Sequence, residues 1–300
     1  MTPRPSSSQS SVVEVVRHLS PAPRGARARA RVRRRGLTYV EVLVIIGLIA
    51  IAVAFLLPSM QRTNCGGNRV KCASNLRQIG QAILLYSNDN KGAYPRALYA
   101  SGPSVIPTWG TPAPAPNDVS AAMFLLLRTQ DITPEVFTCP SSNTEKWDFG
   151  GGSNTALNHF NWTDVKKNLS YSYQNVYPDD AAAAWMNEQK FSYNNSISAE
   201  FAVAADINPG LKNGPTSNVF TVTTTSSAKD MKAANSPNHE GDGQNVLYGD
   251  GHVSFEQNPF VGVQRDNIYT AKSSTTAFSG TTFLASPFDG NDSVLLPVSE

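Results

Sequence analysis

The chain has 300 residues, of which 16% are charged, and its net charge at pH 7 is +2. The balance is uneven: residues 1–36 hold nine arginines and one acid (Glu14), a net of +8, whereas residues 37–300 hold 16 basic and 22 acidic residues, a net of −6. Because residues 37–300 lack a basic excess, the composition argues against nucleic acid as a partner, and the length allows one domain of about 240 residues beyond a leader and a helix.

Residues 1–36, rich in Ser, Pro, Ala and Arg, are predicted to form a basic leader. After Gly36, an apolar run of 21 residues, Leu37–Leu57, contains one charge, Glu41. At about 1.5 Å of rise per residue, this run would form a helix roughly 31 Å long, which matches a bilayer core of roughly 30 Å. A carboxylate in such a run is costly and indicates a partner charge. We therefore expect a transmembrane and assembly helix over residues 37–58, with its N-terminus held in the cytoplasm by the arginines.

The segment Arg35-Gly36-Leu37-Thr38-Tyr39-Val40-Glu41 resembles the processing site of type IV pilins and type II secretion pseudopilins. The resemblance implies that a prepilin peptidase cuts after Gly36, that Leu37 becomes the N-methylated first residue, and that Glu41 takes the fifth mature position. Pro58 falls on the twenty-second, where pilins often carry a helix-bending proline. The chain departs from the family in having Leu37 in place of the usual phenylalanine, and Tyr39-Val40 in place of Leu-Ile.

The same resemblance implies an α+β, pilin-like fold. Its long N-terminal helix would have a transmembrane first half and would pack on a small antiparallel β-sheet with long loops. Apolar residues at steps of three and four predict an amphipathic helix over residues 59–94, including Leu76, Ile79 and Ile83. Gly66-Gly67 is expected to interrupt this helix, since glycine costs about 1 kcal/mol in a helix interior.

Residues 95–270 are expected to form an extracytoplasmic α+β domain, and residues 271–300 a poorly ordered tail. A proline-rich loop opens the domain over residues 95–117. Helices are predicted at Ser120–Arg128 and Ala181–Met186, and strands at Leu169–Val176, Phe201–Ala205 and Asn218–Thr224. The clearest signal is a hairpin from Val246 to Phe255 around the turn Gly249-Asp250-Gly251.

The three cysteines are Cys65, Cys72 and Cys139. An exported domain favours an oxidised pair, and we expect Cys72–Cys139, with Cys65–Cys72 as the rival pair. No C-x-x-C is present, so the sequence does not favour a zinc site.

The stretch from Asn238 to Val253 contains the side chains of the domain that are best suited to metal binding or catalysis. With ten residues between His239 and Asp250, it resembles the H-x(9–10)-D-G-H-V tail of a pseudopilin subgroup abundant in planctomycete-like bacteria. The favoured interpretation is structural: Asp250 and Gly251 form a turn before His252. No cofactor is predicted. A calcium site is a weaker alternative, which the resemblance to calcium-binding major pseudopilins suggests; its ligands would be the carboxylates of Asp206, Glu240, Asp242 and Asp250. Catalysis by His239, His252, Asp206 and Asp250 is the least favoured, because their spacing matches no catalytic motif.

Together these features predict a non-enzymatic pseudopilin or pilin-like subunit of a type II secretion or type IV pilus-like filament. Its partners would be the prepilin peptidase, other pilin-like subunits and the inner membrane, with the globular domain periplasmic. A cleaved secretory signal fits poorly, because the apolar run is too long and no A-x-A follows it. A plain signal anchor fits the length but leaves Glu41 unexplained. The alternative function is therefore a signal-anchored extracytoplasmic enzyme or binding module that uses the region of His239 and Asp250.

Overall fold

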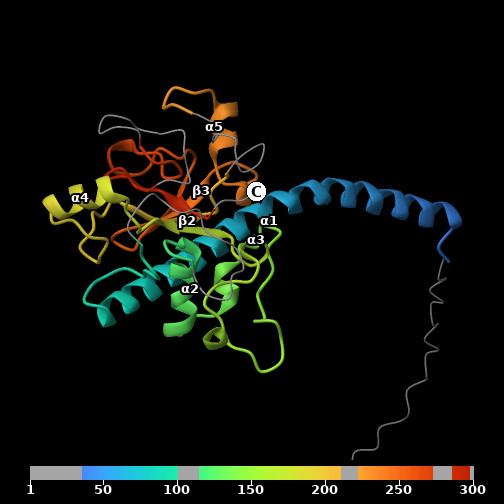
Figure 1. Cartoon of the computed structure of the whole chain (residues 1–300). Helices are drawn as coiled ribbons and strands as arrows, with labels where there is room; N and C mark the ends of the chain where they lie inside the picture. The colour runs from blue at the N-terminus through green and yellow to red at the C-terminus, as the bar shows by residue number, and fades with distance from the viewer. Residues whose placement is uncertain (1–35, 101–114, 211–221, 273–285, 298–300) are drawn as a thin grey trace, which may run out of the picture. The chain divides into compact units, whose positions relative to one another are not determined.

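A computed structural model describes residues 36–100, 115–210, 222–272 and 286–297, with the side chains of residues 54–65 left out (Figure 1). Almost all of the predicted leader lies outside the described residues. The chain forms two units, Met1–Ala54 and Phe55–Glu300, and each is described by itself.

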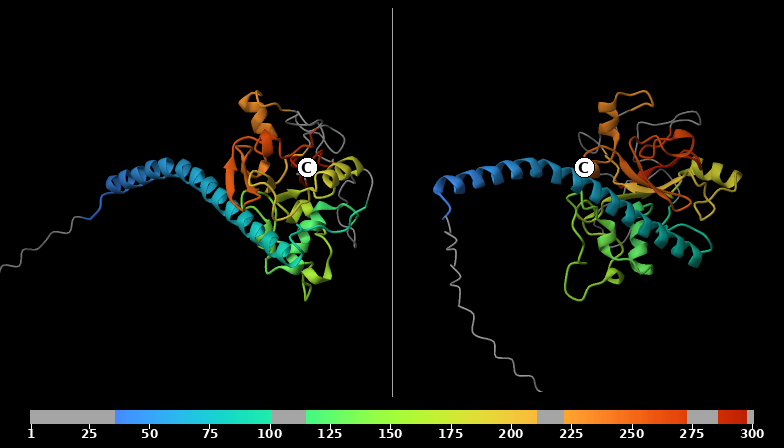
Figure 2. Two further views of the ribbon diagram at one scale, coloured as in Figure 1. Left: turned by 90° about the vertical axis from the view of Figure 1, so that its left-hand side faces the viewer. Right: turned by 180° about the vertical axis from the view of Figure 1, so that it is seen from behind.

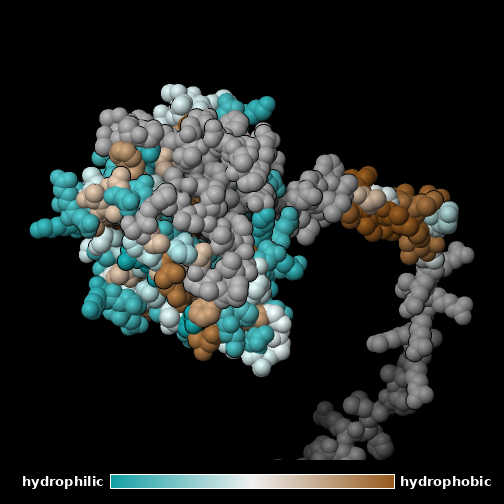
Figure 3. Space-filling model, viewed as in Figure 1, coloured by the Kyte–Doolittle hydropathy of each residue, from teal (hydrophilic) through white to brown (hydrophobic). Residues whose placement is uncertain are grey.

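The described part of the N-terminal unit is the beginning of helix α1 (Tyr39–Asp89). Thr38 and Glu41 form a capping box: the Glu41 carboxylate accepts from the backbone N–H of Thr38 (2.8 Å), and the Thr38 hydroxyl accepts from the backbone N–H of Glu41 (3.3 Å). The large apolar side chains from Leu37 to Val53 are all between 40% and 79% exposed, and Figure 3 shows apolar residues along the visible face of this part of the helix.

The predicted transmembrane first half of this helix is wrong. Among the described residues, no helix has the length and apolar character needed to cross a membrane. The fold supported by the structure is α+β with a five-stranded antiparallel sheet.

Two further expectations for α1 have different outcomes. The interruption at Gly66-Gly67 is wrong, because the helix continues through both glycines to Asp89. Pro58 also lies within α1, but its side chain is outside the described residues, and the bend expected there stays a prediction.

The larger unit is built on a sheet with strand order β4-β3-β2-β1-β5, all pairs antiparallel. The strands are β1 (Tyr171–Gln174), β2 (Ala202–Asp206), β3 (Gln244–Tyr248), β4 (Val253–Glu256) and β5 (Leu295–Leu296). The predicted hairpin is confirmed, with Leu247 opposite Val253. The tail was expected to lack order, yet it supplies β5, whose Leu296 pairs with Tyr173.

The second half of α1 packs across one face of this sheet (Figure 2). Leu76 and Ile79 are fully buried, as the amphipathic pattern predicts. Gly80 allows a close approach to β3, because a Cβ atom at this position would lie 2.8 Å from Cδ1 of Leu247. The opposite face, with Val246 of β3, is covered by Ile268 and Tyr269.

The described residues of the unit also form the α-helices α2 (Val119–Thr129), α3 (Val165–Asn168), α4 (Asp180–Glu188) and α5 (Ala228–Ala234). Helices α2 and α4 confirm the two helices expected from the sequence. Helix α2 begins at a buried cap, Asp118, whose side chain accepts from the N–H of Ala121. The strand predicted over Asn218–Thr224 lies mainly outside the described residues, and its described end is not a strand.

The turn between β3 and β4 has a steric reason for its first glycine. A Cβ atom at Gly249 would lie 2.3 Å from the backbone oxygen of Ser198, whereas one at Gly251 would meet nothing within 4 Å. Gly251 instead has a φ of +87°, which disfavours other residues. We expect Gly249→Ala to lower the free energy of unfolding by about 1–3 kcal/mol through overpacking. Gly251→Ala, the matched control, should lower it by only about 1 kcal/mol. Urea denaturation compares them, and equal losses would contradict the steric argument.

Candidate functional site

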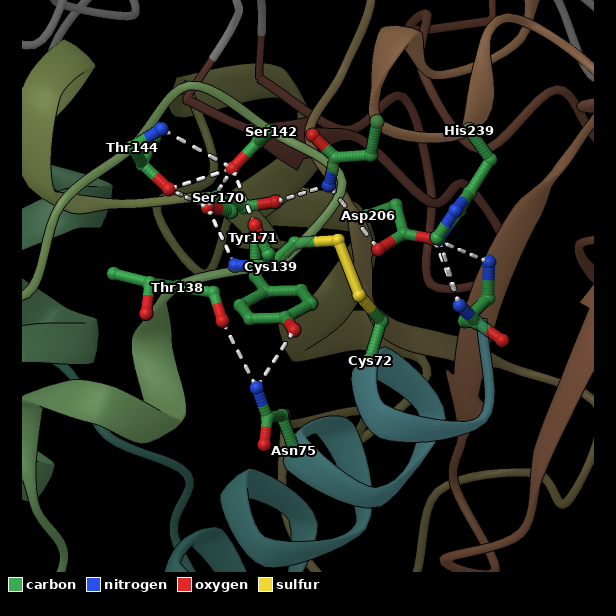
Figure 4. The surroundings of a disulfide bond; sticks show 12 residues. Cys72, Asn75, Thr138, Cys139, Ser142, Thr144, Ser170, Tyr171, Asp206 and His239 are labelled. Carbon is green, nitrogen blue, oxygen red and sulfur yellow. Dashed lines mark hydrogen bonds and ion pairs between the residues drawn. A yellow bond between two sulfur atoms is a disulfide. The ribbon is translucent and has the colours of Figure 1, made fainter. Parts of the chain in front are cut away.

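A disulfide bond lies at the centre of a buried polar cluster in the larger unit (Figure 4). It joins Cys72 of α1 to Cys139, which follows the short helix η1 (Pro134–Phe137), with a Cα–Cα distance of 5.4 Å. Both cysteines are buried. This is the pair that the sequence favours over Cys65–Cys72, and the side chain of Cys65 is outside the described residues. The bond fastens the long helix to a segment that follows 67 residues later.

Asp206, the last residue of β2, places a fully buried carboxylate beside the disulfide. Its Oδ2 accepts from Asn245 twice, from the backbone N–H (2.6 Å) and from the side-chain amide (3.0 Å). Its Oδ1 accepts from the amide of Asn238 at 3.2 Å. Burying a carboxylate without such donors would be strongly unfavourable, so these contacts explain how Asp206 is accommodated in the core.

His239 is the ionisable partner of this carboxylate. It ends the short helix η3 (Pro237–His239), is 5% exposed, and places Nε2 3.1 Å from Oδ2 of Asp206. The amide of Asn245 lies 3.2 Å from the same nitrogen, and one of its two N–H groups donates to Asp206. An unprotonated Nε2 would place its lone pair against the carboxylate oxygen, so the geometry fits the tautomer in which Nε2–H donates to the carboxylate. The imidazole also packs edge-on to Phe255, with ring centroids 5.8 Å apart.

A second layer of polar side chains lies behind the sulfurs (Figure 4). The amide of Asn75, one turn beyond Cys72 on α1, donates to the backbone oxygen of Thr138 (2.9 Å) and to the hydroxyl of Tyr171 (3.2 Å). Burial raises the pKa of Tyr171 well above its usual value, and the charge of Asp206 raises it further, so the phenol stays protonated. These bonds hold the Cys139 loop against α1 and β1.

The structure brings together only part of the predicted His–Asp motif. His239 joins Asp206, whereas Asp250 and His252 are exposed at the β3–β4 turn. There Asp250 Oδ1 accepts from the backbone N–H of His252 (3.0 Å) and lies 2.5 Å from its Nδ1. The imidazole of His252 stacks on Tyr248 at 4.4 Å. These contacts fit the turn-forming role that the sequence favours for Asp250.

The four carboxylates considered for calcium occupy different environments. Asp206 is buried and accepts hydrogen bonds from Asn238 and Asn245, whereas Glu240, Asp242 and Asp250 are exposed. Asp242 forms ion pairs with Lys232 (2.8 Å) and Arg69 (2.9 Å), and the hydrogen bond from Lys232, followed by the positive charges, lowers its pKa. The described contacts therefore provide no common shell for the four oxygens, and the calcium site stays a prediction.

Two features of this region have little signal in the sequence. Asn245 and Asn238 hold Asp206, but neither a strand buried on both faces, such as β3, nor a three-residue helix, such as η3, has a periodicity that marks a buried asparagine. A buried acidic cluster near the C-terminus was also missed. In it, the Lys272 ammonium lies 4.0 Å from carboxylate oxygens of both Asp266 and Asp289, and Asp292 accepts from the backbone N–H of Lys272.

The acidic cluster makes the stability of the fold depend on pH. Burial raises the pKa of Asp292 to about 7, and burial and the neighbouring Asp292 carboxylate raise that of Asp266. These two carboxyl groups therefore bind more protons in the folded protein than in the unfolded chain between about pH 4 and pH 7, where an unfolded aspartate has already ionised. We expect the free energy of unfolding to fall as pH rises through this window. Urea denaturation at successive pH values should show this slope, and a smaller one in Asp292→Asn. A stability that rises toward pH 7 would contradict the assignment.

The residues around the disulfide offer sulfur, nitrogen and oxygen atoms of the kinds that bind metal ions. One atom each from Cys72, Cys139, Asp206 and His239 lies within 4.8 Å of the other three, and all four residues are buried. A histidine–carboxylate pair can move protons, but acid–base catalysis also needs contact with a substrate, and the described residues leave this pair 0–5% exposed. In the oxidised state the cluster is therefore a closed structural centre. Comparison of the chain with family models, curated proteins and solved structures finds no match.

Proposed function

We propose that the chain is a pilin-like subunit of a filament of the type II secretion or type IV pilus class. A prepilin peptidase at the inner membrane would cut between Gly36 and Leu37, and the new N-terminus would be N-methylated. The subunit would then assemble with other pilin-like subunits through the first part of α1. In this proposal the chain is a structural component and not an enzyme.

The observation that carries the proposal is the apolar surface of α1 next to the processing motif. Every large apolar side chain from Leu37 to Val53 is at least 40% exposed in the isolated chain. A helix that is apolar on all sides requires burial. Equivalent helices from neighbouring subunits would supply that burial, at about 25 cal/mol per Å² of apolar surface. Glu41 would then pair with the positive N-terminus of a neighbouring Leu37.

The disulfide supports an extracytoplasmic position for the globular unit. Disulfides persist in oxidising compartments and are rare in the cytoplasm. The Cys72–Cys139 bond lies wholly within the larger unit, so this unit would be on the oxidising side. The alternative of an enzyme or binding module using His239 and Asp250 is not favoured, because His239 is buried and Asp250 is paired with His252.

The direct test is the N-terminus of the protein isolated from its native cells. Intact-mass measurement and N-terminal sequencing should find a chain that begins with N-methylated Leu37. The same chain expressed in cells without a prepilin peptidase should keep its leader. A native chain that begins near Met1 would exclude processing and, with it, the filament proposal.

A further inference from the structure

We propose that Cys72, Cys139, Asp206 and His239 form a zinc-binding site when the disulfide is reduced. The oxidised chain and the zinc-bound chain would be two alternative states of one buried centre. The proposal concerns only the larger unit and is independent of filament assembly.

The first argument is the chemistry of the donors. Zinc in structural sites is bound by four ligands drawn from cysteine thiolates, histidine nitrogens and carboxylate oxygens. Two thiolates favour zinc over calcium or magnesium, which prefer all-oxygen shells. The four residues provide two sulfurs, one nitrogen and one carboxylate, and the 0–5% exposure of the residues suits a closed structural site.

The second argument is distance. With zinc–sulfur bonds of about 2.3 Å and zinc–nitrogen or zinc–oxygen bonds of about 2.0–2.2 Å, neighbouring ligand atoms of a tetrahedron lie about 3.3–3.8 Å apart. His239 Nε2 and Asp206 Oδ2 are already 3.1 Å apart, and all four donor atoms lie within 4.8 Å of one another. Reduction releases the two sulfurs from their bond, after which they have to separate to about 3.8 Å. In the proposed state, this separation comes from rotation of the two cysteine side chains.

The third argument is the support around the ligands. Metal ligands are usually oriented by hydrogen bonds from an outer shell of residues. The amides of Asn245 and Asn238 hold the Asp206 carboxylate, and Phe255 packs against the imidazole of His239. Arg69 in turn lies over the ring of Phe255, with its guanidinium carbon 4.4 Å from the centroid. These contacts fix two ligands independently of the disulfide.

The change of state balances as a thiol–disulfide exchange followed by metal binding. A dithiol reductant gives two electrons and two protons to the Cys72–Cys139 bond and becomes a disulfide itself. Zinc then binds the two cysteines as thiolates and takes the place of the proton on Nε2 of His239. The two thiol protons pass to solvent, and the imidazole stays neutral with its proton on Nδ1. Oxidation of the thiolates reforms the bond between the sulfurs and releases the metal.

Cobalt(II) is a suitable probe, because tetrahedral thiolate coordination gives it intense visible absorption. The full chain is reduced with a dithiol in mild denaturant, returned to buffer under argon and freed of reductant. We expect one cobalt per reduced chain, displacement by zinc, and no binding to the oxidised chain. His239→Gln and Asp206→Asn should each weaken binding by about tenfold or more, as loss of even a supporting residue does. The matched controls His252→Gln and Cys65→Ser should bind as the parent chain does.

A second measurement avoids dependence on the folding of the variants. Zinc added to the reduced parent chain should protect Cys72 and Cys139 from alkylation, as read by peptide mass spectrometry, without protecting Cys65. Reduced chain that takes up no cobalt, or zinc that leaves both cysteines as reactive as before, would overturn the proposal. Cobalt spectra unchanged in both ligand variants would do the same. None of these outcomes bears on processing at Gly36, so the two proposals fail separately.

Discussion

Removing the Cys72–Cys139 disulfide is expected to lower the free energy of unfolding of the larger unit by about 4 kcal/mol, as the chain-entropy model gives for a closed loop of this length. The bond joins residues separated by 67 positions, so its loss restores much freedom to the unfolded chain. That loss would be a large part of the roughly 5–15 kcal/mol by which a typical domain is stable. The bond also fastens α1 to the Cys139 loop.

The double variant Cys72→Ala/Cys139→Ala tests this expectation in urea denaturation without reductant. Cys65→Ala is the matched control, since Cys65 lies in the same helix and outside the bond. The control should retain the parent midpoint. A loss below about 1 kcal/mol in the double variant would contradict the entropic argument. It would mean that contacts of Leu76 and Ile79 already restrict α1 in the unfolded chain, so that the bond removes little further freedom.

The sequence predicts those parts of the fold that rest on local pattern. The step of three and four residues through Leu76 and Ile79 identifies the buried face of α1, and the Gly249-Asp250-Gly251 turn identifies the β3–β4 hairpin. The two-residue strand β5 has no such pattern. Leu295 and Leu296 become a strand only because β1 offers them a free edge.

The candidate site could be predicted only in part, because its members come from four separate segments. Asp206 and His239 are visible as candidates, but the sequence groups them with Asp250 and His252, which lie close along the chain to His239. The actual grouping depends on tertiary contacts: β2–β3 pairing and the hydrogen bonds of Asp206 bring it to His239, and the disulfide adds Cys72 and Cys139. No spacing rule contains this information, because the ligand spacings of known zinc motifs are short-range.

Glu41 is part of two sequence patterns, the filament-processing motif and a helix capping box, and only the first was used to interpret it. Thr38-Tyr39-Val40-Glu41 has the T-x-x-E pattern of a capping box, and the structure contains that box. A lone acid at this position therefore has a local role even without a filament. Any test of an assembly role has to separate the charge of Glu41 from its capping hydrogen bond.

Glu41→Gln makes this separation, because glutamine at the same position also completes a capping box. If Glu41 pairs with the N-terminus of a neighbouring subunit, the variant should be processed after Gly36 as usual but should fail to enter filaments. Breaking a buried charge pair costs about 3–5 kcal/mol, so incorporation should fall by about a hundredfold or more. Thr38→Val is the complementary control, because it removes the hydroxyl of the cap and keeps the charge, and it should assemble. The measurements are N-terminal sequencing and the fraction of subunit recovered in sheared or cross-linked filaments. Normal assembly of Glu41→Gln, together with loss of assembly in Thr38→Val, would assign Glu41 to capping alone.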